Sequence, residues 1–448
     1  MKIEFITNAS FLIELSDGRT ILTDPWYSDG IYHGIIFNYP PVPDRLKARI
    51  LSGRPDYIYV SHIHGDHFDP PTLAHFPKDT PVLIGQFPMP ALANAIKGLG
   101  FTDVRELPFG ELADVDGIGL CVFDQFSGSN DDLGNETNLP VDTSIFIRDK
   151  DGTGLFHNVD NPIQLRHAEE IGRRFGPIDA AILPYASVSV FPAMFGHYSH
   201  DEKMRRVEAL MTGRVAKFCE LATAMGARKS IPAAGSFVFG GKASGLAVYQ
   251  CQAVPSRIED LWREGGLPPD GLLQLAPGDR LDLSTDEVEQ REPGAIRNFS
   301  IEDRIAYART LAHVPCDLDL IRLPETMRVP WRSLVGKARA AMWGRQQQLG
   351  IRPALDILIE IEGSDTMPLP GGGPVSLRMP LDAPDLAAAG EAVPAGRDWL
   401  RFRISANVAL AVLLGISPWG VAEYHMAIDR DPDRFDPAVG TLLGFFKL

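Results

Sequence analysis

Residues 59–70, YVSHIHGDHFDP, decide how the rest of the chain is interpreted. A short apolar stretch, residues 57–60, runs directly into a segment that carries three of the eleven histidines of the chain. An aspartate lies between the second and the third of these histidines. Imidazole nitrogen and carboxylate oxygen are common ligands of transition metals, so their density directly after a strand is typical of a metal site.

The spacing inside this segment predicts how the ligands are arranged. His62 and His64 point the same way, because alternate side chains of an extended chain lie on one face. Gly65 then allows a sharp turn. Asp66 and His67 follow, and they can hold a second ion or line the open side of the first. Neutral imidazole suits zinc or iron, so one or two ions of either metal are expected.

The composition limits the partners of the protein. Its 448 residues are 45% hydrophobic and 23% charged, which is ordinary for a globular protein of two or three domains. The formal net charge of −15 argues against nucleic acid as a partner, because an acidic surface repels a phosphate backbone. An anionic small-molecule substrate stays compatible with this charge, since a bound metal reverses the field locally.

Signals for export or membrane insertion are missing from the sequence. There is no run of about 18 apolar residues, so no membrane span is expected. The N-terminal MKIEFITNASFLIEL lacks the basic region and cleavage site of a signal peptide. The four cysteines form no C-x-x-C pair, which argues against a disulfide framework or a structural zinc site. A cytoplasmic protein is therefore expected.

The order of strand-like and helix-like segments predicts the architecture. Over the first 250 residues, strands followed by helices occur in two rounds, which is typical of an α/β protein built as an αββα sandwich. Residues 251–295 are expected to form a connecting segment. Residues 296–448 combine helical patterns with plainly alternating strands and are expected to form a smaller α+β C-terminal unit.

The histidine-rich segment resembles the H-x-H-x-D-H signature of the metallo-β-lactamase superfamily. That resemblance implies that Asp24, in TDPW, supports the metal ligands from behind. It also implies that Asp160, at the end of LFHNVD, bridges two metal ions. Asp66 and Asp160 are then the carboxylates expected to take part in catalysis, by orienting or deprotonating a water molecule.

Within the superfamily, the chain is most similar to the branch of CMP-N-acetylneuraminate monooxygenases, without their Rieske iron–sulfur domain. The shared features are DPW with an aromatic and proline-rich insert, VDTSIF, IPAAGSFVF and the terminal SPWGVAEYHMAIDRDPDRF. The insert contains Trp26, Tyr27, Tyr32 and Phe37, which either form a wall of a substrate site or pack in the core. The resemblance implies a sugar-like substrate.

Two departures from the superfamily pattern concern the ligands. The loop SGSNDDLGNETNLPVDT contains no histidine where one is usual, so Asn138, Asp132 or water would have to substitute. Gly235 and Ser236 stand where the final histidine is usual. One ion held by two histidines and a carboxylate is therefore the minimum expectation, and this ligand set also suits non-haem Fe(II).

Two further histidines, His197 and His200 in FGHYSHDEK, precede a long helical pattern. They are candidates for replacement metal ligands or for substrate contacts. The alternative is that both are exposed residues of a loop at the start of a helix.

Three functions are compatible with these features. The first is a hydrolase, in which a metal ion lowers the pKa of water from about 15.7 to about 7 for attack on an ester, lactone, amide or phosphoester. The second is an iron-dependent oxygenase that receives electrons from a separate protein, since no C-x-H or C-x-x-H pair for a Rieske cluster is present. The third is a metal-binding protein without catalytic activity.

Overall fold

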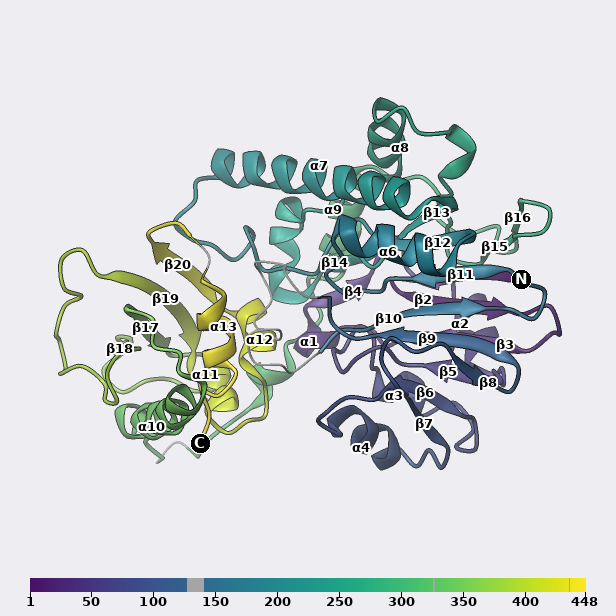
Figure 1. The fold of residues 1–448 in the computed structure, drawn as a ribbon. Helices are drawn as coiled ribbons and strands as arrows, with labels where there is room; N and C mark the ends of the chain where they lie inside the picture. The colour runs from purple at the N-terminus through teal and green to yellow at the C-terminus, as the bar shows by residue number, and fades with distance from the viewer. Residues whose placement is uncertain (127–140, 325–326, 435) are drawn as a thin grey trace.

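The computed structural model describes residues 1–126, 141–324, 327–434 and 436–448. A two-sheet sandwich forms the larger part of the protein, and a smaller unit of helices around a four-stranded sheet lies beside it (Figure 1). The expected αββα sandwich followed by an α+β unit is confirmed. Among the described segments, none of the helices combines the length and the apolar character needed to cross a bilayer.

The first sheet of the sandwich has eight strands in the order β16-β15-β1-β2-β3-β5-β6-β7. The strands β3, β5, β6 and β7 are parallel, so their carboxyl ends lie at one edge. Their bounds are β1 (Lys2–Thr7), β2 (Ser10–Glu14), β3 (Thr20–Thr23), β5 (Tyr57–Tyr59), β6 (Val82–Gly85), β7 (Val104–Leu107), β15 (Asp279–Asp282) and β16 (Glu287–Gln290).

The second sheet has six strands in the order β13-β12-β11-β10-β9-β8. Here β11, β12 and β13 are parallel, and the other neighbours are antiparallel. The bounds are β8 (Ala113–Val115), β9 (Ile118–Phe123), β10 (Ser144–Arg148), β11 (Gly154–His157), β12 (Ile178–Pro184) and β13 (Ala227–Ala233).

Apolar side chains fill both faces of each sheet. In β5, Tyr57 and Tyr59 point into the core between the sheets, and Ile58 points to the helices outside. This alternation follows from the two-residue period of a strand, and a sheet that is covered on both sides has to be apolar throughout. The outer helices are α2 (Asp44–Leu51), α3 (Pro70–Leu73) and α4 (Ala91–Gly98) on the first sheet, and α6 (Leu165–Phe175), α7 (His200–Met225) and α8 (Pro255–Glu264) on the second.

The C-terminal unit is built on the sheet β18-β17-β19-β20. The pattern of residues 418–429 predicts a helix, but residues 427–431 form strand β20, because they pair with β19. The strands are β17 (Leu355–Glu362), β18 (Val375–Pro380), β19 (Asp398–Ser405) and β20 (Ala427–Asp431). The helices are α10 (Trp331–Leu349), α11 (Ala406–Leu413), α12 (Trp419–Ala422), η4 (Glu423–His425) and α13 (Pro437–Leu443).

Several short elements lie between these two parts. They are α1 (Ile31–Gly34), β4 (Ile36–Asn38), β14 (Phe237–Phe239), η1 (Gly241–Tyr249), η2 (Pro269–Gly271), α9 (Ile301–Thr310) and η3 (Asp317–Leu320). Strands β4 and β14 pair with each other, and their apolar residues Phe37 and Phe239 share one hydrophobic cluster with the C-terminal sheet.

The expected boundaries at residues 250 and 295 stay a prediction, and two sets of contacts cross them. Residues 251–295 do more than connect, because β15 pairs with β1 and extends the first sheet. Conversely, Phe37 and Phe239 from the first 250 residues pack into the core of the C-terminal unit. Pairings and packing between distant segments decide both assignments, and neither leaves a mark in the local pattern of residues.

Candidate metal centre

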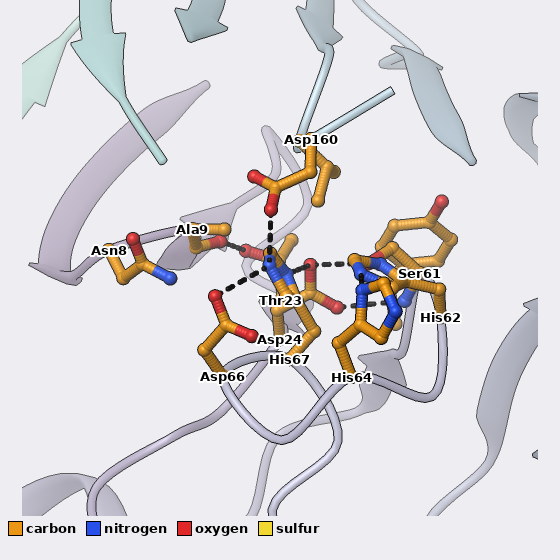
Figure 2. A network of polar contacts seen from close by, with 12 residues as sticks. Asn8, Ala9, Thr23, Asp24, Ser61, His62, His64, Asp66, His67 and Asp160 are labelled. Carbon is orange, nitrogen blue, oxygen red and sulfur yellow. Dashed lines mark hydrogen bonds and ion pairs between the residues drawn. The ribbon is translucent and has the colours of Figure 1, made fainter. Parts of the chain in front are cut away.

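The histidine-rich segment lies where the carboxyl ends of strands from both sheets meet. Asp24 follows β3, residues 61–67 follow β5, and Asp160 follows β11. Figure 2 shows the side chains of these three segments converging on one point. Parallel neighbours end at the same edge of a sheet, so the fold brings together residues that are far apart in the chain.

Two groups of three side chains have donor atoms that all lie within 4.8 Å of one another. The first donor group is His62, His64 and Asp142, and the second donor group is His62, His67 and Asp160. In the first, Nε2 of His62 is 2.9 Å from Nδ1 of His64 and 3.5 Å from Oδ1 of Asp142. In the second, Nε2 of His67 is 3.1 Å from Oδ2 of Asp160.

Asp24 holds both donor groups from behind. Its buried carboxylate accepts hydrogen bonds from the backbone N–H and the hydroxyl of Ser61, at 2.8 and 2.7 Å. It also lies 2.9 Å from Nδ1 of His67. The hydroxyl of Ser61 is in turn 2.9 Å from Nδ1 of His62. One carboxylate thus orients His67 directly and His62 through Ser61, which leaves the Nε2 atoms of both rings facing the centre.

His62 belongs to both donor groups, which limits how they are filled. Because its Nδ1 contacts Ser61, only Nε2 can bind an ion. A full set of two imidazoles and one carboxylate is therefore available to one ion at a time. A second ion would have to share the remaining donors with Asp66, whose Oδ2 lies 3.3 Å from Nε2 of His67.

The electrostatics of the centre suit a cation. Burial, together with the neighbouring His67 and His64, holds the pKa of His62 well below its usual range, so this ring is neutral and needs to lose no proton to bind a metal. Burial by itself would lower the pKa of His67 too, but the carboxylates of Asp66 and Asp160 outweigh it and raise that pKa well above its usual value. The charge of His67 in turn lowers the pKa of Asp66 against the opposing effect of burial.

This donor chemistry fits a metal ion. Imidazole nitrogens and carboxylate oxygens converge at distances that a cation could bridge after small side-chain shifts, and a positive charge is already favoured where His67 carries one. His67 and Asp24 are buried, so their charges are costly to place there without partners of opposite charge. His62, His64, Asp142, His67 and Asp160 would hold the ion or ions.

Asp142 escaped the sequence analysis, and Tyr32 was expected either in a wall of a substrate site or in the core. Asp142 lies in VDTSIF, the motif that carried the resemblance, but only its position beside His62 marks it as a donor. The hydroxyl of Tyr32 donates a hydrogen bond of 3.0 Å to Asp66. Tyr32 and its neighbour His33 both have positive φ, 53° and 61°, a strained backbone that is common at functional sites. Asn138 and Asp132, the expected substitutes, lie outside the described residues.

The structure does not bring His197 or His200 to either donor group. His200 is the first residue of α7, which begins there because the side chains of Ser199 and Glu202 cap it, and its Nδ1 contacts the hydroxyl of Tyr249. His197 lies within 3.8 Å of carboxylate oxygens of the C-terminal unit. Both histidines therefore contact groups other than the predicted ligands.

One known domain matches the first part of this chain. Residues 2–210 match the beta-lactamase superfamily domain, so the resemblance carried by the histidine motif is confirmed. This match supports a metal-dependent enzyme.

Two relatives are similar to parts of this chain. A protein of Mycobacterium tuberculosis (strain ATCC 25618 / H37Rv), assigned as a Rieske 2Fe-2S iron–sulfur protein, is 32% identical over 206 residues, which are 44% of this chain and 36% of that protein. The cytidine monophosphate-N-acetylneuraminic acid hydroxylase of Mus musculus is 31% identical over 121 residues, 26% of this chain and 20% of that protein. The matched stretch thus spans about a third or less of these relatives.

Two solved structures resemble part of this chain. The isothiocyanate hydrolase from Delia radicum gut bacteria matches 63% of this chain and 98% of its own, with 19% identity and a TM-score of 0.44. A diiron beta-hydroxylase from Streptomyces venezuelae matches 64% of this chain and 54% of its own, with 17% identity and a TM-score of 0.40.

Proposed function

We propose that the protein is an iron-dependent oxygenase that hydroxylates a small molecule and receives its electrons from a separate protein. The observation that carries this proposal is the composition of the two donor groups, each of which combines two imidazoles with one carboxylate. That set is the one non-haem Fe(II) prefers. The sequence by itself favoured hydrolysis over oxygenation. Because the first donor group contains the carboxylate of Asp142 in place of an imidazole, we now favour oxygenation over hydrolysis.

Two relatives also support the proposal of an oxygenase. The 31% identity to a CMP-N-acetylneuraminic acid hydroxylase and the 32% identity to a Rieske-assigned protein both favour oxygen chemistry. The four cysteines of this chain are buried and separate, and none is followed by a histidine at the spacing of a Rieske pair. In this proposal the iron–sulfur centre that delivers the electrons lies on a separate protein.

The residues of the chain would position the reaction. When bound, iron would supply the redox chemistry that activates dioxygen. Asp24 and Ser61 keep the imidazoles in one orientation, and Tyr32 holds Asp66 by its hydroxyl. The carboxylate of Asp160 is the more open one, with 29% of its side chain exposed, and it is placed to accept a proton on the substrate side.

Hydrolysis is the second candidate, and the same carboxylate favours it. A metal ion held by these residues would lower the pKa of water from about 15.7 to about 7, and Asp160, as the more open carboxylate, would accept a proton. The two candidate functions predict different bound metals and different oxygen consumption. Protein purified without added metal should contain iron and consume oxygen when a chemical reductant is supplied. Zinc with no oxygen consumption, even after loading with iron, would instead favour the hydrolase.

A single substitution tests the role of the first donor group. Asp142→His replaces the carboxylate of this group by an imidazole. Because an imidazole nitrogen is a better zinc ligand than a carboxylate oxygen, protein from cells grown on both metals should have a higher ratio of bound zinc to bound iron. Asp201→His, on the exposed first turn of α7, is the matched control and should leave the ratio unchanged. An unchanged ratio in Asp142→His would remove Asp142 from the ligands.

A further inference from the structure

A cavity of about 590 Å³ lies where the C-terminal unit meets the segment that follows β12. Its walls come from β19, β20, α12 and α13 on one side and from residues 188–195 on the other. Small-molecule sites have volumes of about 300–1,000 Å³ and are common at the junction between two parts of a protein. None of the residues of the two donor groups lines this cavity.

The wall of the cavity is mostly apolar and aromatic. Phe191 and Phe195 face it from the segment after β12, and Trp399, Phe402 and Tyr424 face it from the C-terminal unit. Rings of this size provide a large contact area for the apolar part of a ligand. The cavity is therefore suited to a molecule with an aromatic or aliphatic body rather than to a sugar.

The wall of the cavity has more acidic side chains than basic side chains without an ion-pair partner. Arg430 is paired with Asp433 at 2.9 Å, and Arg434 is paired with Asp398. Three carboxylates of the wall, Glu423, Asp431 and Asp436, form no ion pair within the part of the chain that the structure describes, and Asp436 accepts a hydrogen bond from the backbone N–H of Ala438. Because both arginines are already neutralised, a ligand meets a wall with unpaired negative charge.

The cavity is linked to the metal centre by two stacked rings. Tyr424, in its wall, stacks on Tyr32 with ring centroids 5.4 Å apart, and Tyr32 donates its hydroxyl hydrogen to Asp66. His425, next to Tyr424, has its Nε2 2.8 Å from the backbone oxygen of Tyr32. Figure 1 places α12, the helix before these residues, beside α1 at the junction of the two parts. The stacked rings of Tyr424 and Tyr32 therefore connect the wall of the cavity to Asp66.

We propose that this cavity binds the substrate of the metal centre, and that the substrate is an apolar small molecule carrying a protonated amine. The amine is recognised by Glu423, the aromatic wall holds the body, and Tyr424 is the boundary across which the reacting end approaches the metal. The statement that the bound molecule is a substrate rests on the proposed function, but binding of this molecule to the cavity requires no metal. The C-terminal unit is then the part of the chain that sets specificity.

Three matched probes test the ligand class: 4-phenylbutylamine, 4-phenylbutanol and 4-phenylbutyrate. Binding is measured by calorimetry on the full chain, metal-free and metal-loaded, at pH 8, above the pKa of about 7 to which burial raises Glu423. The amine should bind about tenfold or more tightly than the alcohol, as expected for a hydrogen bond to a charged group, and the acid should bind least. In Glu423→Gln, which keeps the shape of the side chain, this preference should disappear.

Two glycines test the place of binding. Gly420 lines the cavity and has no atom within 4 Å of the Cβ position, so Gly420→Trp should fill the cavity and abolish binding without disturbing the backbone. Gly213→Trp, at an equally open position on α7, should bind the amine as the wild type does. Circular dichroism checks the folding of both variants, and Glu423→Gln decides the matter if Gly420→Trp does not fold.

The outcomes keep the two proposals apart. An amine that binds no more tightly than the alcohol, or a preference that survives in Glu423→Gln, would overturn the cavity proposal whatever metal the protein holds. Selective amine binding in a protein that takes up no iron and consumes no oxygen would leave the amine site in place and overturn the proposed oxygenase instead.

Discussion

Replacing Asp24 by asparagine should weaken metal binding by both donor groups at once. The carboxylate accepts hydrogen bonds from the backbone N–H and the hydroxyl of Ser61, and it contacts Nδ1 of His67. The hydroxyl of Ser61 in turn contacts Nδ1 of His62 and so orients that ring. Asparagine has the same size and tolerates the positive φ of 36° at this position. The change therefore removes the charge and one acceptor while leaving the backbone as it is.

The expected magnitude follows from the number of imidazoles that Asp24 orients. Removing a group that orients one metal-binding side chain costs about 10–100-fold in metal affinity. Asp24 supports His67 directly and His62 indirectly, and His62 is common to both groups. A loss near the upper end, about 100-fold or about 2.7 kcal/mol, is expected for Asp24→Asn.

Competition titration with a chelator measures this loss for Fe(II) and Zn(II) separately. Asp149→Asn is the matched control, because Asp149 is equally buried and accepts hydrogen bonds from the backbone and hydroxyl of Ser16, just past the far end of β10. That variant should keep the affinity of the wild type. If folded Asp24→Asn binds either metal within twofold of the wild type, or if Asp149→Asn loses as much, the supporting role of Asp24 is disproved.

Three further predictions use other parts of the structure. His62→Ala should lose metal from both donor groups, whereas Asp142→Ala should weaken only the first; elemental analysis showing equal losses would contradict the shared role of His62. The raised pKa of His67 stabilises the metal-free protein fully below the unfolded value of about 6.5, and this contribution is lost as the pH rises through the folded pKa. Urea unfolding of metal-free protein should show that decline, metal affinity should rise over the same range, and a flat stability profile would refute the assignment. Gly172→Ala should destabilise by about 1–3 kcal/mol, because its Cβ would lie 2.4 Å from a carbonyl oxygen at the end of α7. Gly213→Ala, in open space on α7, should gain up to about 1 kcal/mol in the same denaturation assay, and equal effects of the two changes would exclude the close approach.

The sandwich could be predicted from the sequence because its elements are specified locally. Alternation of residues in strands such as 57–59, and the capping residues before α7, depend on neighbours within a few positions. The cluster of His62, His64, Asp66 and His67 is local in the same sense, since one strand end presents all four side chains. The end of the chain shows the limit of local patterns, because residues 427–431 become strand β20 only through pairing with β19.

The rest of the centre depended on the tertiary structure. Asp142 lies 80 positions after His62 in the chain, and only the stacking of the second sheet on the first brings them within 3.5 Å. Tyr32 reaches Asp66 through a strained backbone that is held by contacts with Tyr424 and the C-terminal unit. The sequence by itself therefore determined the type of protein and the histidines of its centre. The tertiary structure decided which carboxylate completes the first donor group and which aromatic side chains lie beside it. Both depend on contacts between distant segments, and such contacts follow from global packing, which no local pattern records.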